Sequence, residues 1–454
     1  MNIFQINRSD IEDRFDPKYI LYLKDIHNFK YDIFPLKRFL IEKPQYGTAE
    51  IGIPRIKEQQ PRYIRITDIN DFGELDDSLG ATAENCSDEY FLYENDLLFA
   101  RSGATVGKTY LHKHLSYPAF FAGYMIRVRL DESTLLPDYL FAYTQTSFYK
   151  NWVDAIQRAA AQPNINAEEY ASLPIPLPPL SVQQTIVDLY TDAHNQRERK
   201  LEEAQKLLES VDAYLLSELG IELPQEDNTL RKRIFKVSSS QLIGSRWDCS
   251  SNKNDFSLNS NKFTNVKLFD VVSINPSVYF PLNIEEITFI PMEAIDENYG
   301  EITANYKKEV VESNGFTRFM QGDLLWAKIT PCMQNGKSAV VRETINGYAC
   351  GSTEFFVLRC NKNKIDVNYL FYIMHVKKLR EYATNFFGGN AGQQRVSKDF
   401  LLNLEIPLPP LDKQIDIASK LQEIQNNAKQ LKNEADMILQ EAKQKVERMI
   451  LGDE

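Results

Sequence analysis

The sequence predicts an α+β fold in which a mixed α/β domain followed by a long helix occurs twice in tandem. Three observations lead to this prediction. Short motifs recur in the same order in both halves of the chain. Short strand-like runs, separated by Gly, Pro, Asn and Asp, fill most of each half. A heptad pattern then closes each half, which is typical of a helix that packs against another helix.

The internal repeat consists of six motif pairs. The hexapeptide IPLPPL begins at Ile175 and recurs 231 residues later at Ile406, followed by Gln183 and Gln414 respectively. The other pairs are DLLFAR at 96–101 and DLLWAK at 323–328, GK at 107–108 and 336–337, YLF at 139–141 and 369–371, and RFD at 14–16 with RWD at 246–248. These spacings are close to half of the 454 residues, so we conclude that the duplication covers the whole chain.

The repeats place the domain boundaries. Because proline fixes φ and lacks an N–H, each IPLPPL segment should be stiff and extended, ending a domain and leading into a helix. We therefore expect a first mixed domain at 1–180, a long helix at 181–222, a linker at 223–240, a second mixed domain at 241–410 and a second long helix at 411–454. Within the mixed domains, one helix is expected at about 139–156 and another at about 369–386.

The two long helices carry an apolar seam. In the second helix, steps of three and four residues give a seam that includes Leu421, Ile424, Leu431 and Ile438 and is broken at Lys445. In the first helix the seam shifts phase between Ala193 and Leu201; its residues are Ile186, Leu189, Leu201, Leu208, Val211 and Leu215. We expect the two helices to form an antiparallel coiled coil with a mixed domain at each end. The alternative is that each helix lies only on its own domain.

Composition limits the function classes. With 52 Lys and Arg against 63 Asp and Glu the net charge is −11, which argues against an indiscriminate DNA-binding protein. The five cysteines form no C-x-x-C pair, so we expect reduced thiols in a cytoplasmic protein. No signal peptide is expected, because charged residues from Arg8 onward precede any apolar stretch. The longest apolar run, at about 119–126, is too short for a membrane helix.

The catalytic motifs that the sequence suggests are incomplete. The segment 103–109 resembles a phosphate-binding loop, but it has one residue too few between its glycines, and its repeat at 330–337 lacks the first glycine. A hairpin is expected there instead. Glu198 and Lys200 form a nuclease-like pair without an acidic partner, and His112 and His114 lack a third metal ligand. We therefore expect a non-catalytic chain without a metal or cofactor of its own.

Polar loops recur at matching places in both halves. Their Arg, Lys, Asn and Gln side chains are of the kinds that make paired hydrogen bonds with purine edges. The candidate DNA-binding residues are Arg101, Ser102, Thr105, Lys108, Gln162 and Asn164 in the first half, and Lys328, Thr330, Asn335, Lys337, Gln393, Gln394 and Arg395 in the second. The alternative is that each loop is an ordinary turn.

Taken in order, these motifs resemble the specificity subunit of Type I restriction-modification enzymes over essentially the whole chain. The segment 158–161 departs from the glycine-bearing loop of such domains, which the second copy keeps at 388–392. The resemblance implies two target-recognition domains, each reading one half of a bipartite, asymmetric site in double-stranded DNA. It also implies that the helices dock two DNA adenine methyltransferase subunits, and that restriction/translocase subunits join them. S-adenosylmethionine and ATP would then bind those partners.

Three other functions stay open at this point. The chain could be a coiled-coil scaffold with two protein-binding domains, a specificity chain that serves a methyltransferase without a restriction partner, or an ATPase. Co-purification with an adenine methyltransferase would separate the first from a specificity subunit, and nucleotide binding by the isolated chain would test the last.

Overall fold

The computed structural model describes residues 22, 29–76, 78–157, 163–223, 256–389 and 393–452. It divides the chain into two compact units. Unit 1 comprises residues 1–200 and 433–454, and unit 2 comprises residues 201–432. Each unit therefore contains one mixed domain together with parts of both long helices. The motifs at 14–16 and 246–248, the segment 158–161, Cys249, residues 390–392 and nearly all of the predicted linker lie outside the described residues.

The mixed domain of unit 1 has two four-stranded sheets and a two-stranded neck. The first sheet has the order β2-β9-β6-β7, formed by Gln45–Tyr46, Met125–Val128, Leu97–Ala100 and Thr109–Leu111. The second has the order β3-β5-β4-β8, formed by Ile53–Pro54, Ala81–Thr82, Arg62–Ile64 and Ala119–Phe121. In the neck, β1 (Ile33–Pro35) pairs antiparallel with β10 (Pro174–Pro176), so the chain enters and leaves the domain at one place.

The mixed domain of unit 2 repeats the first sheet and the neck, whereas its second sheet has the parallel strand pair at the centre and not at an edge. Its first sheet has the order β12-β19-β16-β17, formed by Val272–Ile274, Phe355–Cys360, Leu324–Ala327 and Ser338–Val340. Its second has the order β14-β13-β18-β15, formed by Tyr306–Glu309, Glu286–Ile290, Tyr348–Gly351 and Thr317–Met320. A neck pairs β11 (Asn265–Lys267) with β22 (Glu405–Pro407), and β20 (Phe387–Gly388) pairs with β21 (Arg395–Val396). The predicted tandem duplication of an α+β domain is confirmed.

Short helices accompany the sheets in each domain. Unit 1 has α2 (Pro137–Thr144), α3 (Ser147–Ile156) and α4 (Ala167–Ala171); unit 2 has α7 (Val367–His375), α8 (Lys377–Ala383) and α9 (Lys398–Asn403). Single 3₁₀ turns occur at Leu36–Phe39, Ile66–Asp68, Asp88–Tyr90, Leu268–Asp270, Met292–Ala294, Val310–Ser313, Ile345–Gly347 and Thr384–Phe386.

The single helix expected at 139–156 is in fact two helices, α2 and α3. The Thr146 side chain accepts a hydrogen bond from the Tyr149 N–H and thereby caps a new helix. The segment expected at 369–386 is likewise divided, because α7 ends at His375 and α8 begins at Lys377. Hydrophobic periodicity alone does not reveal such breaks, since apolar residues continue across them.

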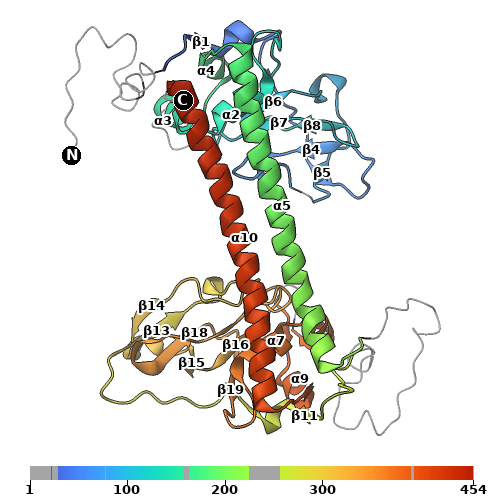
Figure 1. The fold of residues 1–454 in the computed structure, drawn as a ribbon, viewed down its shortest axis with the longest axis vertical. Coiled ribbons are helices and arrows are strands. Elements are labelled where there is room, and N and C mark those ends of the chain that lie inside the picture. Colours follow the sequence, from blue (N-terminus) through green and yellow to red (C-terminus); the bar gives the residue numbers. More distant parts are fainter. Residues whose placement is uncertain are drawn as a thin grey trace. The chain divides into compact units, whose positions relative to one another are not determined.

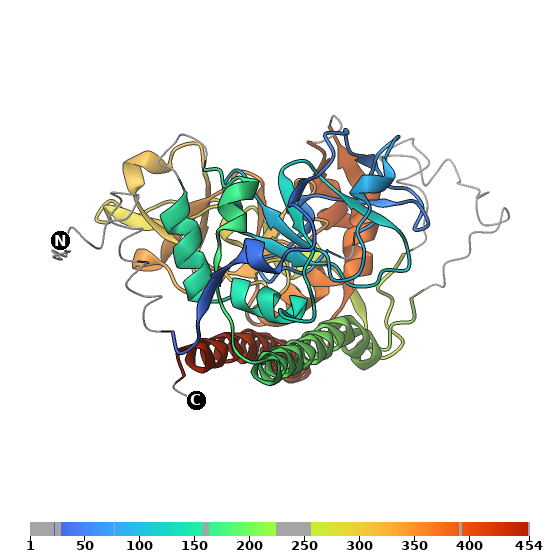
Figure 2. The same ribbon diagram turned by 90° about the horizontal axis from the view of Figure 1, so that it is seen from above.

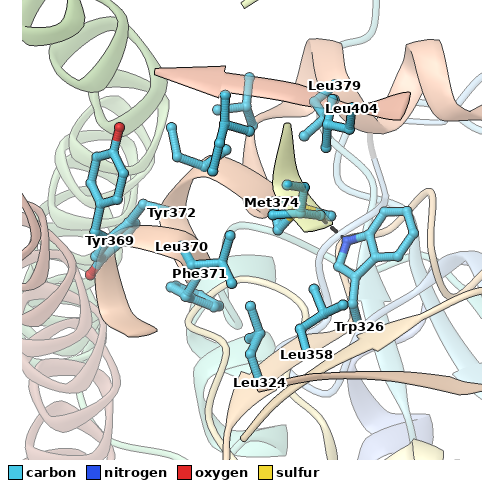
Figure 3. Close-up of a cluster of buried hydrophobic side chains, with 14 of the residues drawn as sticks. Leu324, Trp326, Leu358, Tyr369, Leu370, Phe371, Tyr372, Met374, Leu379 and Leu404 are labelled. Atoms are coloured by element: carbon cyan, nitrogen blue, oxygen red, sulfur yellow. Dashed lines mark hydrogen bonds between the residues drawn. The ribbon is translucent and has the colours of Figure 1, made fainter. Parts of the chain in front are cut away.

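The main core of unit 2 lies between its first sheet and α7 (Figure 3). Leu324, Trp326 and Leu358 project from the sheet toward Leu370 and Met374 of α7. The Trp326 indole N–H donates to the Met374 carbonyl at 3.2 Å, so the buried polar atom of this side chain is satisfied. Burying a side chain of this kind stabilises the fold by roughly 1.5–3 kcal/mol.

Both long helices contribute to the core of each unit. They are α5 (Leu180–Leu219) and α10 (Leu411–Leu451), and they lie side by side in opposite chain directions (Figure 1). In unit 1, Lys200 Nζ lies 2.6 Å from Glu434 Oε2, and Ile186 shares a core with Ile450. In unit 2, Lys413 pairs with Glu218 at 2.6 Å. In each unit the helices lie along one side of the mixed domain (Figure 2). The predicted antiparallel helix pair is confirmed.

The buried stripe of each long helix differs from the predicted seam. Ile186, Val211, Leu215 and Leu421 are buried, whereas Leu189, Leu201, Leu208, Ile424, Leu431 and Ile438 are half-buried. In the second half of α10 the deepest positions come one residue later, at Leu439, Val446 and Ile450, so Lys445 does not interrupt the packing. The helix faces a mixed domain as well as its partner helix, and this widens its apolar face beyond a two-helix seam.

The predicted phase shift in the first helix has a different explanation. Arg197 occupies the gap between Ala193 and Leu201 and is buried. Its guanidinium stacks on the Phe72 ring at 4.3 Å and pairs with Glu74 at 3.0 Å. The buried stripe of α5 therefore continues through Arg197. A search for apolar residues alone does not find a buried arginine.

No helix within the described ranges has a long enough apolar stretch to span a bilayer.

Candidate nucleic-acid interface

In unit 1 the structure brings the two predicted polar loops together. Ser102 and Asn164 form an antiparallel bridge between them. The Ile165 N–H donates to the Arg101 carbonyl at 2.8 Å, and the Gly103 N–H donates to the Pro163 carbonyl at 3.2 Å. Gln162 lies outside the described residues.

The same pairing occurs in unit 2. Ile329 and Arg395 form the equivalent bridge. The Thr330 N–H donates to the Gln394 carbonyl at 3.0 Å, and the Val396 N–H donates to the Lys328 carbonyl at 2.9 Å. About 65 residues separate the paired loops along the chain, so the sequence alone predicted the loops but not their contact.

A third segment completes each surface. The Arg101 N–H donates to the Tyr124 carbonyl at 3.0 Å, and the Lys328 N–H donates to the Glu354 carbonyl at 2.9 Å. We call residues 101–103, 123–124 and 163–165 the unit 1 rim, and residues 328–330, 353–354 and 394–396 the unit 2 rim. The backbone hydrogen bonds of the two rims correspond position by position, although most of their side chains differ.

Each rim borders an open pocket. The unit 1 pocket has a volume of about 620 Å³ and is lined by rim residues together with Thr48, Glu50 and Tyr63. The unit 2 pocket, of about 430 Å³, is lined by Lys328, Thr353, Arg318 and residues 275–279. The loop that follows β2 therefore contributes to the unit 1 pocket, and the loop that follows β12 contributes to the unit 2 pocket. The sequence did not predict either loop, because the two loops share no motif.

Arg101 and Lys328 occupy equivalent positions at these pockets. The Arg101 guanidinium lies over the Tyr46 ring at 4.7 Å, and the Tyr46 hydroxyl accepts a hydrogen bond from the Ala167 N–H at 3.1 Å. Stacking on an anchored aromatic ring restricts the arginine without neutralising its charge. Lys328 Nζ lies 5.7 Å from the Phe356 ring centre. Both cations line the open pockets, so both are available to a ligand.

Arg395 is held by a carboxylate. Its Nε and Nη2 donate to the two oxygens of Glu354 at 2.9 and 2.8 Å, and its Nη1 donates to the Gln393 carbonyl at 2.9 Å. Hydrogen bonding to the guanidinium lowers the pKa of Glu354, so this carboxylate is charged at neutral pH. The pair fixes the orientation of the Arg395 side chain on the unit 2 rim.

Lys108 and Lys337 both make contacts inside their own domains. Lys108 Nζ donates to the Ile69 carbonyl at 3.3 Å and pairs with Asp71 at 2.7 Å. Lys337 Nζ donates to the Ile295 and Met292 carbonyls at 3.0 and 3.3 Å. Both lysines thus fasten a 3₁₀ turn inside their own domain. Their recurrence is explained by a shared structural contact, and the expectation that they reach DNA stays a prediction.

Of the other candidates, Ser102, Asn164, Thr330 and Gln394 belong to the rims, and Thr105, Asn335 and Gln393 lie in turns beside them. The Thr105 carbonyl accepts a hydrogen bond from Lys108 N–H at 3.1 Å, which closes the hairpin turn. The Thr330 hydroxyl contacts the Gln334 side chain, and the Asn335 N–H donates to the Pro331 carbonyl at 3.0 Å. Asn164, Asn335 and Gln393 are exposed, whereas Ser102 and Gln394 are half-buried.

The segment that resembles a phosphate-binding loop is a hairpin, as expected. β6 pairs antiparallel with β7, and in unit 2 β16 pairs with β17. Gly107 has a φ of +87°, and a Cβ there would lie 2.8 Å from Val153. The repeated glycine therefore meets a backbone and packing requirement of the turn.

Among the described residues, Glu74, His194 and Glu198 bring three potential metal-ligand atoms together. Arg197 Nη1, however, lies 3.0 Å from both Glu74 Oε1 and Glu198 Oε1. The guanidinium offsets part of the charge of the two carboxylates and occupies an oxygen of each, which disfavours a cation at this position.

We expect Lys337→Met to reduce the free energy of unfolding by about 1–3 kcal/mol, because two carbonyls lose a charged donor. DNA affinity per folded molecule should not change. Chemical denaturation and a binding titration measure the two quantities. Lys307→Met is a matched control, because Lys307 makes only an exposed ion pair with Glu286. Weaker DNA binding by the Lys337 variant at unchanged stability would contradict the structural role.

The family model for the Type I restriction modification DNA specificity domain matches residues 22–207 and 260–437. The chain belongs to this family. The two matched regions correspond to the two repeats, and each match covers a mixed domain together with much of the long helix that follows it.

Curated relatives agree with the family. The EcoAI specificity subunit of Escherichia coli is 32% identical over 40% of this chain and 31% of its own length, and the EcoEI subunit of the same organism is 28% identical over 41% and 31%. The match therefore spans about a third of these two relatives. The MjaVIII specificity subunit of Methanocaldococcus jannaschii is 21% identical over 80% of each chain.

A solved chain from a study of complex assembly and conformational transition of the type I R-M system has the same fold. It covers 93% of this chain and 96% of its own length, with a TM-score of 0.51 and 18% identity.

Proposed function

We propose that this chain is the DNA sequence-specificity subunit of a Type I restriction-modification system. The observation that carries this proposal is the pair of matching rims. In each unit, backbone hydrogen bonds hold three loop segments beside an open pocket, and polar and cationic side chains line that pocket. Such side chains on a fixed backbone are suited to reading base edges in a DNA groove.

The two rims carry different side chains on the same frame. Unit 1 has Arg101, Tyr124 and Asn164 where unit 2 has Lys328, Glu354 and Arg395. Because base recognition depends on side-chain donors and acceptors, the two units should read different sequences. The target is then a bipartite and asymmetric site in double-stranded DNA, with one half for each unit.

The remaining functions belong to partner subunits. The net charge of −11 is unfavourable for holding DNA by phosphate contacts alone, so partners should supply much of that grip. Two adenine methyltransferase subunits would dock on the long helices, and restriction subunits would join them. S-adenosylmethionine would bind the methyltransferase subunits and ATP the restriction subunits, and this chain would make no catalytic contribution.

Mapping methylated adenines in cells with and without this chain tests the proposal. A bipartite consensus that is methylated only when the chain is present is the expected result. A methylation map that does not depend on the chain would overturn it. Co-purification of an adenine methyltransferase distinguishes a specificity subunit from a coiled-coil scaffold.

Arg101→Ala and Lys328→Ala should each weaken specific binding by about 1–3 kcal/mol and leave binding to unrelated duplexes nearly unchanged, if these cations reach base edges. Titrations with matched specific and unrelated duplexes over a range of salt concentrations measure this. Equal losses of affinity for every duplex, with a shallower dependence of affinity on salt concentration, would show that both residues contact phosphates instead.

A further inference from the structure

Two positions of the rims combine a shared backbone with different side chains. The backbone carbonyls of Tyr124 and Glu354 accept hydrogen bonds from equivalent backbone N–H groups, those of Arg101 and Lys328 respectively. Asn164 and Arg395 form equivalent bridges to the neighbouring loop. Side chains that differ at fixed backbone positions are well placed to determine sequence preference.

At these positions unit 2 carries an arginine that is already oriented. A guanidinium has five N–H groups. Two of those of Arg395 bind the Glu354 oxygens and a third binds the Gln393 carbonyl. Within the described residues, one N–H on Nη1 and one on Nη2 therefore remain for a ligand, and the side chain is 40% exposed. The Glu354 carboxylate holds the Arg395 guanidinium, with its fork of N–H groups, in one orientation before any ligand binds. The side chain therefore loses less conformational freedom when it binds a second group.

The charges of this pair indicate which part of DNA it binds. Glu354 offsets the positive charge of Arg395, so the pair gains less from an anionic phosphate than a free arginine would. Its two remaining donors match the two acceptors of a guanine edge, O6 and N7 in the major groove. The other bases do not present two acceptors there, since adenine has one acceptor and one donor.

We propose that Arg395, positioned by Glu354, is a specificity-determining residue that reads a guanine in the half-site recognised by unit 2. This inference rests on the proposed function of the chain. It assigns Arg395 to base contact and Glu354 to positioning.

The test uses the chain assembled with its methyltransferase subunits. Duplexes carry each of the four base pairs in turn at every position of the unit 2 half-site, as defined by the methylation consensus. Arg395→Ala should reduce the preference for guanine about 5- to 150-fold at one position and leave the others unchanged. Arg395→Lys keeps the charge but loses the fork, and should lose the same preference.

Glu354→Gln separates positioning from structure. It should lower the preference at the same base pair as Arg395→Ala, and the double variant should lose little more than Arg395→Ala alone. Glu286→Gln, which removes an exposed ion pair elsewhere in unit 2, is the control and should keep every preference. Thermal unfolding shows whether each variant is folded.

The outcomes distinguish the two proposals. Equal weakening on all duplexes by Arg395→Ala would overturn the base contact, and an unchanged guanine preference in Glu354→Gln would overturn the positioning role. If the unaltered complex shows no base preference in either half-site, the proposed function itself fails.

Discussion

Replacing Gln414 by leucine should lower the free energy of unfolding by about 3 kcal/mol. The Gln414 side chain is fully buried, and its Oε1 accepts a hydrogen bond from the Asp366 N–H at 2.9 Å. Its Nε2 donates to the Lys364 carbonyl at 3.0 Å and to the Pro409 carbonyl at 2.8 Å. Leucine would leave these three backbone groups without their partner, at about 1–3 kcal/mol for each group that stays buried. Thermal and urea-induced unfolding measure the loss.

The first repeat supplies an independent check of this prediction. Gln183 makes the same three contacts, to the Leu136 N–H at 2.9 Å and to the Thr134 and Pro178 carbonyls at 3.1 and 3.0 Å. Gln183→Leu should therefore cost a similar amount. Gln422→Leu is the control, since among the described residues the Gln422 side chain makes one hydrogen bond, to the Asn426 side chain on the same helix. If the Gln414 variant were as stable as this control, the three hydrogen bonds would not stabilise the attachment of α10 to the mixed domain.

Exchanging residues 37–173 for the equivalent segment of another family member should replace one half-site and leave the other intact. The neck makes this possible because Ile33 pairs with Pro176 and the Leu36 N–H donates to the Leu173 carbonyl at 2.8 Å. The two ends of the exchanged segment are therefore adjacent. Specific sites are typically bound about 10³- to 10⁷-fold more tightly than unrelated DNA, so the change in the methylated consensus should be complete.

The reciprocal exchange is the matched control. Residues 269–403 lie behind the same kind of neck, where the Leu268 N–H donates to the Leu404 carbonyl at 2.8 Å. Exchanging them should alter only the second half-site. A simultaneous change of both half-sites after either exchange would mean that the two units do not read DNA independently.

The framework of this chain could be predicted because it is repeated. Gln183 and Gln414 stand out in the sequence, and each makes the same buried contacts in its unit. Asp96 and Asp323 recur for a similar reason, since each accepts a two-point ion pair, from Arg129 and Arg359 respectively. Strict recurrence also marks Lys108 and Lys337, whose contacts are internal. Recurrence in this chain therefore marks internal structural contacts, and it does not by itself identify a residue that binds DNA.

The candidate reading residues could be predicted only in part. Arg101 and Lys328 were found because they follow a repeated strand motif. Tyr124 and Glu354 were not found, because they differ from each other and reach the rims only through long-range backbone pairing. The burial of Arg197 was missed for a comparable reason, since a charged residue enters an apolar stripe only when tertiary partners satisfy it.

Each unit completes its core with helical residues from the other repeat. Leu439, Val446 and Ile450 of α10 belong to the core of unit 1, and Val211, Leu215 and Leu219 of α5 belong to that of unit 2. The two halves of the polypeptide are thus held together by buried apolar surface in both units. A chain cut between residues 223 and 256 should remain one particle, and two separately produced pieces should reassemble by fragment complementation. Covalent continuity between the repeats then ensures equal amounts of the two halves, while non-covalent packing supplies their cohesion.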